Sequence, residues 1–512
     1  MNKMKQLLVR IKKIEPPTWW LIGIMTAGLI LRLYHIGSQS LWIDESFSAA
    51  ALPGVVKNGV PGFVSGALYN RADLYHYPAG WLYAVFGRNA AILRSLSTLF
   101  GMVSIYITYY LGSKVFRNPV YGLIGASFVA FGTFDIAWSR QIRMYSELQM
   151  FFLSAVTFFY LFLQEKEIKR AWKKLALSAV FALAAIKTHT IAIVILPAYF
   201  AMALFYWRNY LKNFKVIIAG VLLALVVLYL SGGLRWFHLL EQIYLNPQFY
   251  FDDYFAFIFK NHLFELLMFV VAVVFACFKK QKDVLMFILA FALIYCAFGI
   301  NRGMGMRYIY MVMPIFYLIA SYGVVELWKL KNVLGKVAVV GAFTAVMLWQ
   351  PSLVIWPQET YFLEYRPMME NGIVPEYTPQ PNFKKTYDYL KSVAKPDDIF
   401  IVAHSAIQDW YMPDSKAYRI YFTFKGRKET AHALPQPDGS MIDEYTGIPV
   451  LKTPQELADL IKTHHGYVIW DYFSASHINP GFQAVVAQSA APIIKDRFKQ
   501  GYPWTIHYVY KF

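Results

Sequence analysis

Apolar runs separated by short polar loops occupy the first 352 residues of the chain. Eleven runs are interpreted as membrane-spanning helices, at residues 18–34, 93–112, 119–138, 148–164, 174–187, 190–207, 216–232, 264–278, 284–300, 308–327 and 337–353. A spanning helix needs about 20 apolar residues, with a range of roughly 17–25. The alternative is a large soluble enzyme with buried helices, but the charges lie almost only between the runs. The pattern therefore predicts an α-helical polytopic membrane bundle.

The pattern changes after residue 352. Residues 353–381 are rich in Pro, Tyr and Met and are interpreted as a linker. Beyond them, helices are expected at 382–394, 453–463 and 481–491, with Thr453 capping the second, and strands at 399–403, 467–471 and 505–511. This alternation predicts a small α/β domain. The expected domains are a transmembrane domain at 1–352, the linker, and an α/β domain at 382–512.

Composition supports the membrane interpretation. The chain is 57% hydrophobic and 16% charged, whereas soluble proteins average about 25% charged residues. The net charge of +18 is unevenly placed, because residues 1–352 carry 33 Lys and Arg against 14 Asp and Glu, and the remainder carries 16 against 17. The positive charge therefore does not indicate a nucleic-acid partner. The two cysteines lie in predicted spans, so the α/β domain contains no disulfide.

The basic residues also predict an orientation. A basic cluster precedes the first span, and every second loop between spans is basic, so these segments are expected in the cytoplasm. The first apolar run lacks a small-residue cleavage site and is expected to be an uncleaved helix. An odd number of spans then places the α/β domain on the outer face of the cytoplasmic membrane.

The loops expected outside contain an excess of arginine. The residues are Arg32, Arg71, Arg88, Arg94, Arg140, Arg143, Arg235, Arg302 and Arg307. Arginine outside runs against the positive-inside bias, and its planar fork suits phosphate and carboxylate groups. The alternative is that each pairs with an acidic residue of the outer loops.

Two adjacent acids, Asp44 and Glu45, follow the first span. A carboxylate near a substrate hydroxyl can act as general base, and two carboxylates can hold a metal; a solvated turn is the alternative. Asp73, His76 and Tyr77 lie in an aromatic segment that suits sugar stacking or, alternatively, the membrane interface. Further ionisable groups on the same predicted side are functional candidates; they include Lys187 and His189. No nucleotide-binding loop or Cys/His metal spacing is present.

Seven short motifs follow one another along the membrane part of the chain: Trp42-x-Asp44-Glu45, His76-Tyr77-Pro78, Arg94-Ser95, Gly101, Ser139 to Tyr145 with Arg143, Thr188-His189 and Arg307-Tyr308. As an ordered set they resemble those of the integral-membrane GT-C glycosyltransferases. The similarity is to the family 39/83 branch in bacteria, which includes protein O-mannosyltransferases and lipid A aminoarabinose transferases. His76-Tyr77-Pro78 departs from the family's His-Pro-Pro.

The resemblance implies an inverting glycosyltransferase that moves a hexosyl or pentosyl group from a polyprenyl-phosphate carrier to an acceptor hydroxyl. It implies that Asp44 is the general base and that Glu45 positions it or holds a divalent metal, which the sequence neither requires nor excludes. The expected ligands of the donor phosphate are Arg94, Arg140, Arg143, Arg302 and Arg307. The expected sugar or acceptor residues are Asp73, His76, Tyr77, Tyr145, Lys187, His189 and Tyr308.

The implied partners are the lipid-linked donor, membrane lipid and an acceptor that is a protein, a glycolipid or a glycan. Alternatives stay open at the level of function. A transporter or flippase of lipid-linked sugars would share the spans, although it tends to show internal repeats, and none is visible. A polysaccharide polymerase or ligase would use the same donors. A non-catalytic adhesin would act through its α/β domain, whose neutral charge gives that reading no support.

Overall fold

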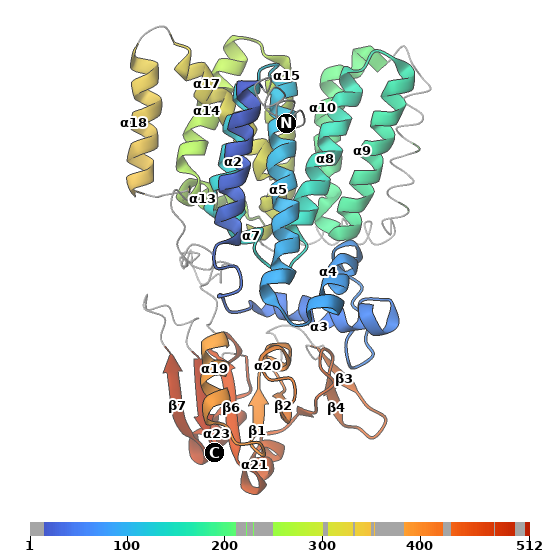
Figure 1. Ribbon diagram of the computed structural model, residues 1–512, viewed down its shortest axis with the longest axis vertical. Helices are drawn as coiled ribbons and strands as arrows, with labels where there is room; N and C mark the ends of the chain where they lie inside the picture. Colours follow the sequence, from blue (N-terminus) through green and yellow to red (C-terminus); the bar gives the residue numbers. More distant parts are fainter. Residues whose placement is uncertain are drawn as a thin grey trace, which may run out of the picture. The chain divides into compact units, whose positions relative to one another are not determined.

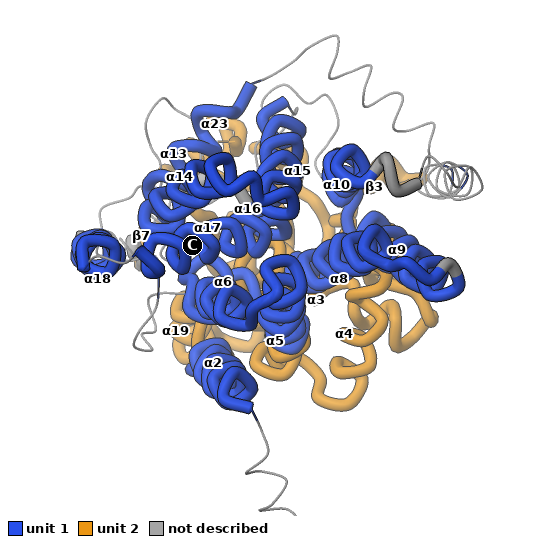
Figure 2. The backbone as a smooth tube through the Cα atoms, turned by 90° about the horizontal axis from the view of Figure 1, so that it is seen from above, with its two compact units in different colours: residues 1–34, 97–140, 144–361 blue, residues 35–96, 141–143, 362–512 orange. Residues whose placement is uncertain are grey.

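The computed structural model describes residues 15–210, 249–300, 306–330, 333–349, 383–422, 432–475, 477–496 and 507–512, with the single residues 222, 229 and 353. Contacts divide the chain into two units (Figure 2). Unit 1 contains residues 1–34, 97–140 and 144–361, and unit 2 contains residues 35–96, 141–143 and 362–512. Unit 2 therefore combines the first predicted outer loop with the C-terminal part of the chain.

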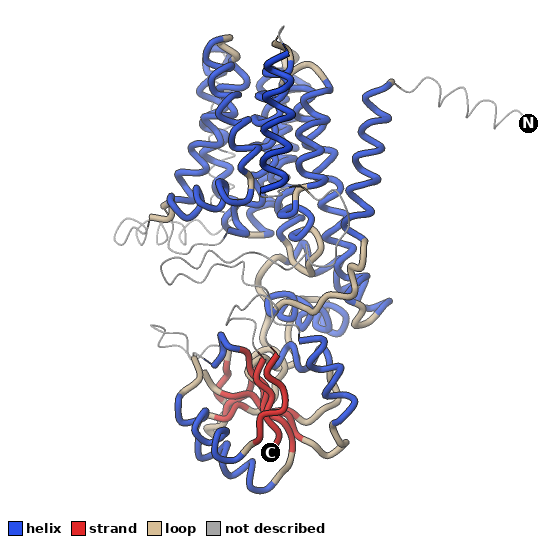
Figure 3. Tube along the Cα trace, turned by 90° about the vertical axis from the view of Figure 1, so that its left-hand side faces the viewer, coloured by secondary structure: helices blue, strands red, loops and turns tan. Residues whose placement is uncertain are grey.

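Unit 1 is a bundle of helices that run side by side (Figures 1 and 3). Its α-helices are α2 (Pro16–Leu33), α5 (Ala90–Val115, whose first residues belong to unit 2), α6 (Pro119–Phe131), α7 (Thr133–Trp138), α8 (Tyr145–Gln164), α9 (Ile168–Thr188), α10 (Ile195–Tyr210), α13 (Phe251–Asn261), α14 (Leu263–Phe278), α15 (Lys282–Gly299), α16 (Met306–Ile309), α17 (Met313–Trp328) and α18 (Val333–Trp349). Two 3-10 helices, η1 (Thr190–Val194) and η2 (Tyr310–Val312), precede α10 and α17. Helix α8 packs against α9, and α17 packs against both α6 and α14.

The predicted apolar runs coincide with described helices or helix pairs, except for 216–232, most of which lies outside the described residues. Among those residues, four helical segments are long and apolar enough to cross a membrane: α5, α8, α15 and Arg307–Trp328. A fifth is formed if α13 and α14, which meet at 107°, count as one span. The predicted run 119–138 is broken at Gly132 into α6 and α7. The total of eleven spans stays a prediction.

The first loop, which belongs to unit 2, forms two helices that the sequence analysis did not predict. They are α3 (Ile43–Asn58) and α4 (Asp73–Phe86), and each has a proline in its interior. Helix α3 begins with a capping interaction, because the backbone N–H of Trp42 donates to the Glu45 side chain at 3.0 Å. Both segments were expected to be irregular loop, because each contains an interior proline and shows only a weak amphipathic pattern.

The C-terminal part of unit 2 is the expected α/β fold. Its sheet has the order β5 (Val450–Leu451), β2 (Ala417–Ile420), β1 (Ile399–Val402), β6 (Gly466–Asp471), β8 (His507–Lys511), β7 (Ala491–Asp496). The first four strands are parallel, and β8 is antiparallel to both neighbours. Its helices are α19 (Phe383–Val393), α20 (Ser405–Tyr411), α21 (Pro454–Thr463), α22 (Tyr472–Ala475) and α23 (Pro480–Ser489). Figure 3 shows the strands between helices.

The sheet is held by a buried apolar core that includes Ile401, Val468, Trp470 and Phe482. The predicted helices and strands of this part are confirmed with shifts of one or two residues at their ends. The predicted cap is confirmed as well, since Thr453 Oγ1 accepts from the Glu456 N–H at 3.2 Å. Strands β2, β5 and β7 and the hairpin β3 (Ala433–Pro435) to β4 (Met441–Asp443) were not predicted.

Within unit 2 the first loop packs on the α/β part. Helix α3 contacts α20, the rings of Phe47 and Tyr445 stack with their centroids 4.3 Å apart, and the Leu41 N–H donates to Tyr411 Oη at 2.9 Å. The predicted linker 353–381 lies outside the described residues apart from Leu353. The predicted domain boundaries remain predictions. They place the first loop in the transmembrane domain 1–352, whereas the structure groups residues 35–96 with the α/β part.

Candidate active site

Glu45 is a buried structural carboxylate. Its side chain is 1% exposed and forms a two-pronged ion pair with Arg94, at 2.9 Å from Nε to Oε1 and 2.8 Å from Nη2 to Oε2. The same two oxygens accept from the backbone N–H groups of Ile142, at 2.7 Å, and Trp42, at 3.0 Å. Four donors use the carboxylate fully, so Glu45 has no lone pair in a good position for a metal ion or a substrate.

Arg94 is used in the same way. Besides Glu45, its guanidinium donates to the carbonyl oxygens of Ile36 at 2.9 Å, Gln39 at 3.2 Å and Ser40 at 3.0 Å. The side chain is 1% exposed. A guanidinium has five N–H donors, and these contacts use all of them. The expectation that Arg94 binds the donor phosphate is therefore withdrawn, since its role is to hold the segment 36–45 in place.

Asp44, the neighbour of Glu45, has a different environment. Its side chain is 25% exposed, and its Oδ2 lies 3.5 Å from Nη2 of Arg143. Arg143 is itself held by Ser48 Oγ at 2.9 Å, Tyr69 Oη at 3.3 Å and the Asp44 carbonyl at 3.1 Å. The result is an accessible carboxylate beside a fixed cation. Ser48 and Tyr69 were not singled out from the sequence, where neither belongs to a motif.

The other predicted residues of the first loop differ in exposure. His76 in α4 is fully buried, and its Nδ1–H donates to the Ala72 carbonyl at 2.9 Å. Burial, with a smaller contribution from the charge of Arg143, lowers the pKa of His76 to about 4 against the opposing effect of that hydrogen bond. His76 is therefore a neutral acceptor through Nε2, which has no partner among the described residues. Asp73 is exposed in the first turn of α4, and Tyr77 is half-buried.

Four predicted residues come together in unit 1. The guanidinium of Arg307 lies 5.9 Å from the ring centre of Tyr145 and 5.5 Å from that of Tyr308. The His189 ring lies 5.3 Å from Tyr308 and 6.1 Å from Tyr145. This aromatic cluster, from segments more than 160 residues apart in sequence, fixes a half-exposed cation. Lys187 is exposed in the last turn of α9 and forms none of these ring contacts.

Arg140, another predicted phosphate ligand, caps a helix instead. Its Nη1 donates to the carbonyls of Leu31, Arg32 and Tyr34 at the end of α2, at 3.1, 2.6 and 2.7 Å. Arg32 serves the end of α6 in the same manner, donating to Val129 and Ala130 at 2.8 Å each. Helix C-termini carry unpaired carbonyls and partial negative charge. Arg140 is 2% exposed and its Nη1 is taken by these carbonyls, so its assignment as a phosphate ligand stays a prediction without support from the structure, and Arg302 lies outside the described residues.

Two buried acids of unit 1 are not among the predicted site residues. Glu147 in α8 is 2% exposed and accepts from Thr188 Oγ1 at 3.3 Å. Asp135 in α7 accepts from Tyr317 Oη at 2.8 Å. A lone acid inside an apolar run is a functional candidate by default, and that signal was available for Asp135 within the predicted run 119–138.

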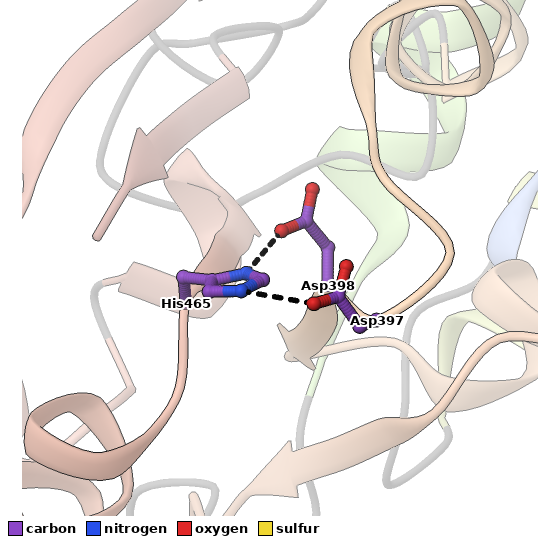
Figure 4. A group of neighbouring side chains, drawn as sticks. All are labelled: Asp397, Asp398 and His465. Atoms are coloured by element: carbon purple, nitrogen blue, oxygen red, sulfur yellow. Dashed lines mark hydrogen bonds and ion pairs between the residues drawn. The ribbon is translucent and has the colours of Figure 1, made fainter.

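The described residues contain one group of three side chains with the spacing of metal ligands, and it is not at Asp44 and Glu45. It consists of Asp397, Asp398 and His465 beside the sheet of unit 2 (Figure 4). His465 lies between the two acids, with Nε2 3.2 Å from Asp397 and Nδ1 2.5 Å from Asp398. Because both ring nitrogens face carboxylate oxygens, each nitrogen of His465 already has a partner within the group.

Part of the chain matches a family of known proteins by sequence, and the whole fold is similar to solved structures. Residues 73–231 match the model of the family described as dolichyl-phosphate-mannose-protein mannosyltransferase. No curated protein matches the chain by sequence. The structure of ArnT from Cupriavidus metallidurans in the apo state is similar, with a TM-score of 0.61 and 13% identity over 97% of this chain and 98% of that one.

Two further structures agree. ArnT from the same organism bound to undecaprenyl phosphate gives a TM-score of 0.56 at 13% identity, over 96% of this chain and 98% of that one. The oligosaccharyltransferase of Archaeoglobus fulgidus in the apo form gives 0.52 at 11% identity, over 93% of this chain and 72% of that one. The chain therefore shares the fold of ArnT and of this oligosaccharyltransferase. The part that matches the family model includes His76, Arg143, Tyr145 and His189 but not Asp44 or Glu45.

Proposed function

We propose that the protein is an inverting glycosyltransferase of the outer face of the cytoplasmic membrane. It moves a sugar from a polyprenyl-phosphate donor to an acceptor hydroxyl. The acceptor oxygen attacks the anomeric carbon, the bond from that carbon to the phosphate oxygen breaks, and polyprenyl phosphate leaves. The hydroxyl proton passes to Asp44. The eleven spans and the outward position of the α/β part belong to this proposal, which rests for sidedness on the distribution of basic residues.

The environment of Asp44 is the observation that carries the proposal. Asp44 and Glu45 are adjacent in sequence, yet only Asp44 keeps an accessible carboxylate. A general base needs an oxygen that the substrate can reach and a fixed position. Arg143, held by Ser48 and Tyr69, supplies a positioned cation 3.5 Å from Asp44 Oδ2. Glu45 then contributes indirectly, because its contacts to Trp42 and Arg94 fix the start of α3.

The donor side is proposed from the aromatic cluster of unit 1. Arg307 is a half-exposed cation between two tyrosine rings, and a guanidinium so placed suits a phosphate oxygen. Tyr145, Tyr308 and His189 offer aromatic faces to a sugar or to the carrier. The similar fold of ArnT, which has been captured with undecaprenyl phosphate, supports a lipid-phosphate carrier. Arg143 stays in the proposal as a partner of Asp44 and as a phosphate ligand.

The test is a transfer assay on the purified full chain. It is incubated with a panel of polyprenyl-phosphate sugars, and release of polyprenyl phosphate is measured. Asp44→Asn should lower kcat by about 100- to 10,000-fold, the usual contribution of a general base, with donor binding unchanged. The matched control is Asp388→Asn, an exposed carboxylate of α19, which should keep wild-type turnover. A folded Asp44→Asn variant with full activity overturns the base assignment.

The same panel separates the enzyme from a carrier of lipid-linked sugars. An enzyme releases polyprenyl phosphate, whereas a flippase moves the intact donor between leaflets of a vesicle. Donor movement without release, in wild-type protein with every donor of the panel, would refute the glycosyltransferase proposal.

A further inference from the structure

Unit 2 contains a pocket of about 460 Å³ whose lining includes none of the candidate active-site residues. Its walls come from the segment after α2, from the turn between α4 and α5, and from α19 and α20. The polar and aromatic residues of the wall are Gln39, Arg88, Asn89, Lys384, Trp410 and Tyr411. Pockets that bind small molecules span about 300–1,000 Å³, so this one has the size of a ligand site.

The aromatic wall is rigid. Tyr411 Oη accepts from the Leu41 N–H at 2.9 Å, and the Tyr411 ring stacks on Tyr387 with centroids 5.5 Å apart and planes at 18°. The Lys384 N–H donates to Ser40 Oγ at 3.3 Å, which joins α19 to the same segment. Trp410, the next wall residue, is half-buried and keeps part of its indole accessible. A preformed wall of this kind lowers the ordering cost of binding.

The polar wall is positive. Arg88 is exposed and paired with Asp409: its Nη1 lies 3.0 Å from Oδ2 and also donates to the Asp409 carbonyl, and its Nη2 donates to Oδ1 at 3.3 Å. The ammonium of Lys384 has no acidic partner among the residues that the structure describes. Asn89 accepts from the Ile92 N–H at 3.2 Å through Oδ1, so its amide N–H donors are left for another acceptor. The wall therefore combines the ammonium of Lys384, the guanidinium of Arg88 that is shared with Asp409, and the amide of Asn89 with the half-buried ring of Trp410.

We propose that this pocket binds an acidic saccharide, a sugar ring that carries a phosphate or carboxylate, as part of the acceptor. The proposal rests on the proposed function only in naming the ligand as the acceptor. Lys384 and Arg88 pair with the anionic substituent, the amide of Asn89 donates to a ring hydroxyl, and Trp410 covers the apolar face of the ring. A free inorganic anion would need no aromatic wall, and a neutral sugar would need no cation.

Binding to the purified full chain tests the proposal directly. The probes are glucose 6-phosphate, glucuronate, glucose and inorganic phosphate, followed by saturation-transfer NMR and tryptophan fluorescence. At least one acidic sugar should bind about 10- to 100-fold more tightly than glucose or phosphate, the contribution expected of charge-assisted hydrogen bonds. Tighter binding of glucose 6-phosphate assigns a phosphorylated acceptor, and tighter binding of glucuronate assigns a uronic-acid glycan. Equal binding of glucose and both acidic sugars overturns the proposal.

Two variants locate the binding. Lys384→Gln should remove the preference for acidic sugars and leave glucose binding unchanged. Trp410→Leu should weaken every sugar by roughly 2- to 10-fold, as expected for a lost aromatic contact, without affecting phosphate. Lys391→Gln, an exposed lysine of the same helix outside the wall, is the matched control and should bind like wild type. If folded Lys384→Gln and Trp410→Leu variants both bind acidic sugars as the wild type does, the proposal that this pocket is the binding site is refuted.

The failure of this proposal and the failure of the proposed function are distinguishable. Asp44→Asn should keep full binding of acidic sugars while it loses transfer. Binding at the pocket by a wild-type protein that transfers no sugar supports the site and removes the acceptor role. Sugar transfer that is unaffected by Lys384→Gln and Trp410→Leu, together with no acidic-sugar binding, removes the site and keeps the enzyme.

Discussion

The substitution Glu45→Gln tests whether the buried acid is structural. Glu45 is 1% exposed and accepts four hydrogen bonds, two of them from Arg94, which is 1% exposed as well. Glutamine has nearly the same shape, but one oxygen becomes an NH₂ group that faces donors. The guanidinium of Arg94 is then a buried charge without a counter-charge.

The expected cost can be bounded. Removing one partner of a buried ion pair costs about 3–5 kcal/mol. A loss of that size lowers the midpoint of thermal unfolding by about 6–20 °C in a domain of roughly 150–250 residues. The loss should exceed that of Asp44→Asn, because the side chain of Asp44 is 25% exposed and exposed ion pairs contribute about 0–1 kcal/mol.

The assay is thermal unfolding of both variants in the same detergent at one scan rate, with sugar transfer measured in parallel. Glu45→Gln should lose stability and, through misplacement of α3, activity. Asp44→Asn should lose activity alone. If Glu45→Gln melts within about 2 °C of wild type while transfer is abolished, Glu45 acts in the chemistry and the structural argument is refuted.

Three other outcomes are expected. The pKa of His76 is lowered from 6.5 to about 4, so between these pH values the unfolded chain binds more protons than the folded chain, and the free energy of unfolding should rise by about 3 kcal/mol from pH 4 to 6.5. His76→Phe should remove this rise when unfolding by denaturant is measured across that pH range. An unchanged pH dependence in the variant contradicts the assignment. Arg307→Ala should weaken binding of polyprenyl phosphate by about 10- to 100-fold, and unchanged affinity excludes it as a phosphate ligand. Arg140→Met should cost about 1.5–3 kcal/mol of stability without altering donor affinity, and the reverse result restores Arg140 as a ligand.

The arginines of the predicted outer loops show how far residue type can be interpreted. Their excess over lysine in these loops predicted specific partners, and the structure gives such partners to Arg32, Arg94 and Arg140. The partners of Arg32 and Arg140, however, are carbonyl groups at helix ends, and that of Arg94 is a buried acid. A guanidinium suits carbonyl, carboxylate and phosphate oxygens alike. Composition therefore cannot separate these roles, and only the neighbours of each side chain can.

The helices of the first loop show a similar limit for the fold. The spans could be predicted because lipid demands long apolar stretches. Helices α3 and α4 contain Pro53 and Pro78, residues that locally disfavour a helix. The two helices pack on each other, α3 packs on α20, and Arg94 and the Ile142 N–H hold Glu45 in the first turn of α3. Most of these contacts are with segments far away in the sequence, so no local pattern predicts them.

The sequence by itself determined the helical membrane bundle and the α/β part, and it singled out the first loop and the loop arginines as candidates for the active site. It could do so because hydrophobic periodicity and the placement of charge are local properties. The tertiary structure decided which of these candidates are accessible. It buried Glu45 against Arg94 and left Asp44 open, it gathered Tyr145, His189, Arg307 and Tyr308 in unit 1, and it formed a pocket from loop, α19 and α20. Exposure and pairing depend on which distant segments meet, and that is a property of the packed chain rather than of its order.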